Sequence, residues 1–165
     1  MTGNREHWGD IDIFLYVFED AGVTILRNEY MKMEIKSQPL VIYDVDDTDY
    51  TRPSDYGQFF EGMTPLDKDA YNILLSHRPD PIETYAEQGF DLVFSGHAHG
   101  GQVRVPLFLN GLFAPDQGWF PKYAGGQYLV GETTMVVSRG LSYYPDLPRV
   151  FNPPEVVLVT LRGAY

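Results

Sequence analysis

The chain has 165 residues, a formal net charge of −11 and no cysteine. Its length suits one domain, and 44% hydrophobic with 15% aromatic residues argue for a buried core rather than disorder. The negative charge disfavours binding to nucleic acid or anionic lipid, and the absence of cysteine excludes disulfides and thiolate chemistry. We find no apolar run of membrane-spanning length and no signal peptide, so we expect a cytoplasmic protein without a transmembrane segment.

The first residues have the character of a site loop. Gly3, Asn4, Arg5, Glu6 and His7 precede any predicted strand that would hold them in place. An asparagine carboxamide is a weak neutral metal ligand, so Asn4 alone would bind nothing. From these residues alone, an N-terminal tail is the alternative interpretation.

A helix is predicted next, because apolar residues repeat at the spacing of one helical face. These residues are Ile11, Phe14, Leu15 and Phe18. Asp10 is a suitable N-cap and Gly22 a suitable residue to follow the helix. We expect this helix to be part of the core and to carry no chemistry.

Strands are predicted over residues 23–26, 30–35 and 40–45, the last two joined as a hairpin around 37–39. Four aspartates, Asp44, Asp46, Asp47 and Asp49, lie at the end of this hairpin. A carboxylate cluster is typical of a site for a hard cation. A solvated turn, or a supporting role outside the metal ligands, is the interpretation that we favour. Residues 50–68 are predicted to be a loop or a short helix.

The next strand, residues 71–76, ends directly in His77. A lone histidine is more often structural than a ligand, but layered α/β proteins place their sites beyond strand ends. Asp80, Pro81 and Glu83 predict the start of a helix, and Gly89 predicts its end. The pattern is that of a βαβ unit leading to the following strand.

That strand, residues 91–95, is followed by Gly96-His97-Ala98-His99-Gly100-Gly101-Gln102. In extended backbone, the side chains of His97 and His99 would point to the same side of the chain. Imidazoles are common metal ligands, so the pair is a candidate metal site. A glycine-rich turn with two surface histidines is the alternative. Further on, residues 128–130 and 133–138 predict a hairpin, and residues 155–161 predict a buried strand.

These motifs, in this order, resemble those of the calcineurin-like metallophosphoesterases, in particular a small bacterial branch that has Gly-His-x-His-Gly-Gly-Gln. The resemblance implies a layered α-β-β-α sandwich and a two-metal site. Asn4, His77, His97 and His99 match metal ligands of the family, and His7 is a candidate for the catalytic histidine, because Arg5 occupies its usual place. The implied cofactors are Mn, Fe or Zn ions, which mixed nitrogen and oxygen sites favour over Mg²⁺.

The resemblance covers only the later motifs of the family. An Asp-x-His and a Gly-Asp motif would lie upstream of Gly3, so residues 1–165 are expected to form a single, partial domain without its first βα units. The expected function is hydrolysis of phosphate mono- or diesters or pyrophosphates. The alternative is a catalytically inactive metal-binding remnant or interaction module. An uncovered sheet would invite association, and peripheral membrane attachment of a full-length protein stays open.

Overall fold

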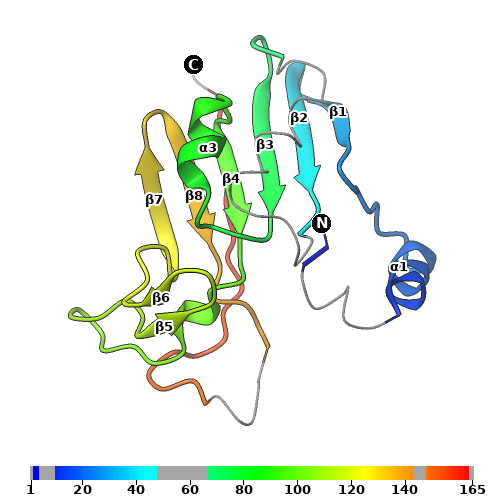
Figure 1. The fold of residues 1–165 in the computed structure, drawn as a ribbon. Helices are drawn as coiled ribbons and strands as arrows, with labels where there is room; N and C mark the ends of the chain where they lie inside the picture. Colours follow the sequence, from blue (N-terminus) through cyan, green and yellow to red (C-terminus); the bar gives the residue numbers. More distant parts are fainter. Residues whose placement is uncertain (1, 4–9, 48–66, 143–147, 164–165) are drawn as a thin grey trace.

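The computed structural model describes residues 2–3, 10–47, 67–142 and 148–163, and its main feature is a six-stranded sheet of order β1-β2-β3-β4-β8-β7 (Figure 1). The sheet strands are β1 (Tyr30–Ile35), β2 (Gln38–Val45), β3 (Tyr71–Ser76), β4 (Leu92–Ser95), β7 (Gly126–Val130) and β8 (Thr133–Val137). The other elements are α1 (Ile11–Asp20), α3 (Ile82–Glu87), a 3₁₀ turn (His99–Gly101), and the ribbon of β5 (Phe113–Ala114) and β6 (Gly118–Trp119). The predicted α/β class is confirmed.

The centre of the sheet is parallel. β2, β3, β4 and β8 run in one direction, whereas the outer strands β1 and β7 pair antiparallel to their neighbours. The predicted βαβ unit is confirmed as β3, α3 and β4. Because β2, β3 and β4 are parallel and in register, their carboxyl ends meet at one edge of the sheet.

Both predicted hairpins are confirmed. The turn of the first is Lys36-Ser37, slightly earlier than the sequence pattern indicates, and both residues have positive φ (51° and 61°). Two left-handed residues suit the twist of a tight β-hairpin. The second hairpin joins β7 to β8 through Gly131-Glu132, where Gly131 has φ 59°.

One face of the sheet is covered by α3 and by the segment around Tyr123. Ile82 and Tyr85 of α3 are fully buried there. They pack with a cluster that includes Val41, Tyr43, Leu74, Phe90, Val93, Tyr123, Met135 and Val137. Burial of a large aliphatic or aromatic side chain contributes about 1.5–3 kcal/mol, so this face holds much of the stability of the fold.

The opposite face is covered only in part. Leu40, Ile73, Leu92 and Val136 form its buried cluster, with Val159 of the C-terminal segment packed against them. In Figure 1 this segment runs behind the sheet. The predicted buried strand over 155–161 is wrong, because the segment pairs with no strand in the part of the chain that the structure describes and leaves Val156 and Leu158 83% and 91% exposed. An apolar run alone does not supply the neighbouring strand that a β-ladder requires.

Two further expectations about the first part of the chain are wrong. Asp10 caps α1 as predicted, since its carboxylate accepts from Asp12 N and Ile13 N, but no residue of the helix is buried. The apolar stripe has no described partner because α1 lies apart from the sheet (Figure 1). Residues 23–26 do not form a strand, since ladder pairing begins only at Tyr30.

Within the described ranges, no helix combines the length and apolarity needed to cross a membrane.

Candidate metal site

The candidate site lies at the edge of the sheet where the parallel strands end. Asp47 is the second residue after β2, His77 follows β3 directly, and His97 is the second residue after β4. The pairing of Val45 with Ser76 and of Leu75 with Phe94 aligns these strand ends. Ligand sites of open α/β sheets lie beyond the carboxyl ends of the strands, so these three side chains occupy the expected position.

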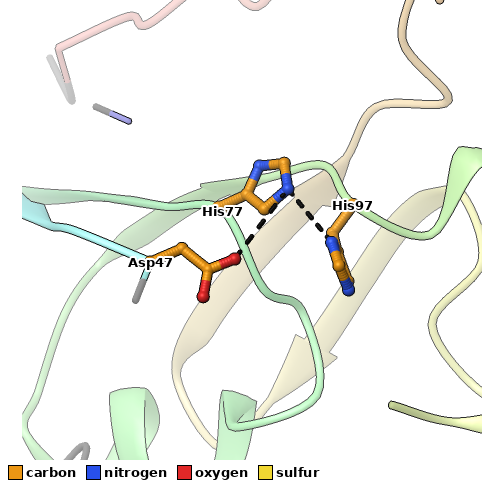
Figure 2. A group of neighbouring side chains, drawn as sticks. All are labelled: Asp47, His77 and His97. Atoms are coloured by element: carbon orange, nitrogen blue, oxygen red, sulfur yellow. Dashed lines mark hydrogen bonds and ion pairs between the residues drawn. The ribbon is translucent and has the colours of Figure 1, made fainter. Parts of the chain in front are cut away.

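Asp47, His77 and His97 present one potential ligand atom each, and these atoms lie within 4.8 Å of one another (Figure 2). His97 Nδ1 is 3.0 Å from His77 Nε2, which in turn is 4.0 Å from Asp47 Oδ2. Asp47 and His97 are buried and His77 is partly exposed. One carboxylate and two imidazoles make a donor set that suits Zn²⁺, Mn²⁺ or Fe²⁺.

A second set of charged groups surrounds this cluster. Arg78 donates from Nε to Asp47 Oδ1 at 2.7 Å, and its Nη1 lies 2.9 Å from Asp116 Oδ2. The same Asp116 oxygen is 2.7 Å from His97 Nε2. Arg78 is buried, so this guanidinium compensates carboxylates from two separate parts of the chain.

The loop that carries His97 has an unusual backbone. His97, His99 and Gly100 all have positive φ (60°, 48° and 63°), which is uncommon for residues other than glycine. The buried Asn152 holds this conformation by donating from Nδ2 to His99 O at 2.7 Å and to Gln102 O at 3.2 Å. A Cβ atom on Gly100 would collide with the Asn152 side chain, so only glycine fits there. Tertiary contacts therefore define the orientation of His97.

The structure brings together two of the residues expected from the sequence, His77 and His97. His99 is not part of the cluster, and its Nδ1 is instead 2.8 Å from Ser142 Oγ. Its role as a metal ligand stays a prediction. Asn4 and His7 lie outside the described residues, as does Asp49.

The expected solvated turn at the end of the first hairpin is wrong. Asp44, Asp46 and Asp47 are almost completely buried, at 0%, 3% and 1% exposure. The Thr2 hydroxyl and Arg27 Nε bind the Asp46 carboxylate, whereas Asp47 faces His77. The signal for Asp47 was its place just beyond a strand, as for His77. Pairing residues 40–45 with 71–76 in parallel would have predicted their proximity.

Arg78 and Asp116 are not among the site residues predicted from the sequence. Arg78 follows a candidate ligand directly, which was a signal for a side chain near the site. Asp116 lies in the turn between β5 and β6, 19 residues after His97. No local pattern reveals that contact, because it depends on how the ribbon folds back over the sheet edge.

The helix of the βαβ unit begins later than the sequence indicates. Pro81 is the N-cap and makes no side-chain capping bond, so the predicted cap by Asp80 is wrong. A capping oxygen must reach the amide of the second or third helical residue, and the turn at residues 80–81 moves the helix start to Ile82. Burial raises the pKa of the Asp80 carboxyl, and the negative charge of Asp116 acts in the same direction.

Tyr85 of α3 supports the loop that holds His77 and Arg78. Its buried hydroxyl is 2.7 Å from Ser76 Oγ and donates to Arg78 O at 3.1 Å. Replacing Tyr85 by phenylalanine should therefore lower the free energy of unfolding by about 1–2 kcal/mol, because buried polar partners lose their bonds. Urea denaturation measures this change. The matched variant Tyr71→Phe, at a partly exposed position, should change it by less than about 0.5 kcal/mol, and equal losses would contradict the assignment.

Fold and site together define an α/β protein with a candidate metal centre at the carboxyl edge of its sheet. Over 168 residues the chain is 34% identical to an uncharacterized metallophosphoesterase of Aquifex aeolicus, covering 99% of this chain and 60% of that protein. It is 29% identical to the uncharacterized metallophosphoesterase YkuE of Bacillus subtilis, over 99% of this chain and 55% of that protein. Phosphodiesterase YaeI of Escherichia coli is 36% identical over 54% of this chain and 32% of its own length.

The chain belongs to the metallophosphoesterase family, as its relatives across nearly its whole length show. No family model matches it, and no solved structure matches it significantly. The chain spans little more than half the length of the Aquifex aeolicus protein and of YkuE, 60% and 55% respectively.

Proposed function

We propose that this chain carries the metal-binding edge of a metal-dependent phosphoesterase, and that Asp47, His77 and His97 hold a divalent cation. The observation that carries the proposal is the convergence of the three ligand atoms within 4.8 Å. The whole protein would hydrolyse phosphate mono- or diesters or pyrophosphates. The relatives named metallophosphoesterase and phosphodiesterase support this class of reaction.

The distances from His77 to its two neighbours in the cluster fit a shared ion. Ligands that each lie about 2.1 Å from one cation are separated by roughly 3–4 Å. The separations of 3.0 Å between the two imidazoles and 4.0 Å between His77 and Asp47 agree with that range. Arg78 binds Oδ1 of Asp47, so that Oδ2 is the oxygen that faces His77. An ion held here would act as a Lewis acid toward a phosphoryl oxygen.

We propose one tightly bound ion for this chain. The described residues contain one group of three ligands, whereas the two-metal site of the family would also use His99 and Asn4. In the described structure His99 contacts Ser142 instead. A second ion would therefore require groups in addition to the described cluster.

The test combines metal titration with a hydrolysis assay. We expect calorimetry of the metal-stripped chain with Zn²⁺ or Mn²⁺ to give about one ion per chain, and hydrolysis of bis-p-nitrophenyl phosphate by this chain to be weak. The protein from the longest reading frame containing this sequence should hydrolyse the diester in the presence of Mn²⁺. Absence of metal binding by both proteins would refute the proposal. Metal binding without hydrolysis by the longer protein would instead favour an inactive metal-binding module.

A further inference from the structure

The two ring nitrogens of His97 have different partners. Nδ1 faces His77 Nε2 at 3.0 Å, and Nε2 faces Asp116 Oδ2 at 2.7 Å. A neutral imidazole has one N–H donor and one acceptor nitrogen. Which nitrogen carries the proton therefore decides which one is able to bind a cation.

The surroundings of Asp116 decide this question. Its Oδ2 also lies 2.9 Å from Nη1 of Arg78, and a guanidinium group only donates. Oδ2 is thus an acceptor for two neighbours, and its short contact with His97 requires a proton on Nε2. His97 Nδ1 then has a lone pair directed toward His77, and His77 Nε2 is the donor in the imidazole pair when no cation is present.

We propose that Asp116 is a positioning residue, which holds His97 in the tautomer whose Nδ1 serves as a metal ligand. The inference rests on the proposed metal site and adds a function for a residue outside it. Carboxylates that accept from the second nitrogen of a ligating histidine fix the ring orientation and make the ligand more basic. Loss of such a partner typically reduces metal affinity 10–100-fold.

The ribbon that carries Asp116 is well anchored. Asp116 has φ 63° in the turn between β5 and β6. The next residue, Gln117, accepts from Tyr123 N at 2.8 Å and donates to Tyr123 O at 3.1 Å. Tyr123 is itself buried in the core against α3. The carboxylate is therefore held against His97 by the fold rather than by a single flexible side chain.

The direct test reads the tautomer by NMR. In ¹⁵N-histidine-labelled, metal-free protein at a pH where imidazoles are neutral, two-bond ¹H–¹⁵N spectra should show His97 protonated at Nε2. Addition of Zn²⁺ should leave the proton on His97 Nε2 in place. It should remove the proton from His77 Nε2, because that nitrogen then binds the ion. A His97 signal protonated at Nδ1 in the wild-type protein would overturn the proposal. This readout does not depend on any phosphoesterase activity.

Two variants separate the possible roles of Asp116. Asp116→Ala removes the acceptor, so His97 should become a mixture of tautomers and zinc affinity should fall 10–100-fold. Asp116→Asn removes the charge but keeps an oxygen for both donors, so the tautomer should persist and most of the affinity should return. Glu132→Ala, in the exposed turn between β7 and β8, is the control that also removes one acidic side chain. It should change neither the tautomer of His97 nor the affinity for zinc.

Each remaining outcome decides the question. Equal losses of affinity in Asp116→Ala and Asp116→Asn, with the tautomer unchanged in both, would mean that the charge matters and would overturn the positioning role. If the wild-type protein binds no metal, the proposed function fails. The NMR spectra of the wild-type protein and of the Asp116 variants still show whether Asp116 determines the tautomer of His97. If Asp116→Ala does not fold, the wild-type spectrum and Asp116→Asn still test the assignment.

Discussion

Replacing His97 by alanine should weaken the binding of Zn²⁺ at least about 100-fold. A ligand contributes more than the outer partners whose loss typically reduces affinity 10–100-fold, and Asp47 and His77 would remain as the only described donors of the cluster. Calorimetric titration of the metal-stripped protein measures the affinity. His97 has positive φ, a conformation in which histidine is more common than alanine, so the thermal unfolding midpoint must be measured in parallel.

His77→Ala is the cleaner second variant, since His77 is not among the residues with positive φ. It should show a similar loss of zinc affinity with little change in the unfolding midpoint. His99→Ala then discriminates between the two views of the site. Retained affinity in that variant would agree with the cluster of Asp47, His77 and His97, whereas an equal loss would mean that His99 shares the ion.

The contribution of Asp44 to the stability of the metal-free chain should fall as pH rises from about 4 to above 6. Burial raises the pKa of the Asp44 carboxyl from 3.8 to about 6, and the neighbouring Asp46 charge adds to this. The folded state therefore holds the proton more tightly than the unfolded state. The associated stability is fully present below pH 4 and is lost as pH passes through 6. A shift of this size corresponds to about 3 kcal/mol.

Urea denaturation at several pH values, with a chelator present, measures this effect. The variant Asp44→Asn cannot titrate at this position, so its stability relative to the wild-type protein should rise by about 3 kcal/mol between pH 4 and pH 7. Asp69→Asn, in an exposed turn, is the matched control and should run parallel to the wild-type curve. If the curve for Asp44→Asn is also parallel, the carboxyl does not titrate as described.

The local part of the fold was predictable from the sequence. Two hairpins and the βαβ unit follow from residue pattern and turn chemistry, and they place His77 and His97 beyond neighbouring strands. The C-terminal run at residues 155–161 was not predictable in the same way. Its apolar residues indicate burial, but whether they form a strand depends on a neighbouring strand elsewhere in the chain.

The remaining members of the site depend on long-range packing. Asp47 joins the histidines because β2 pairs in parallel with β3, across a connection of 25 residues between Val45 and Tyr71. Asp116 reaches His97 because the β5–β6 ribbon folds back over the sheet edge. The spacing of residue types along the chain therefore predicts neither the contact of Asp47 nor that of Asp116 with the histidines of the site.

The assembly of the site from three strand ends links metal binding to the folding equilibrium. In an unfolded chain nothing holds Asp47, His77 and His97 close together in space. In the folded chain, a slip of one residue in the pairing of β2 with β3 would turn side chains to the other face of the sheet. An ion that binds only the native register stabilises that register by mass action. At a free concentration 100 times the dissociation constant, the gain is about 2.7 kcal/mol. The fraction of molecules in the native strand register therefore depends on the concentration of the free ion.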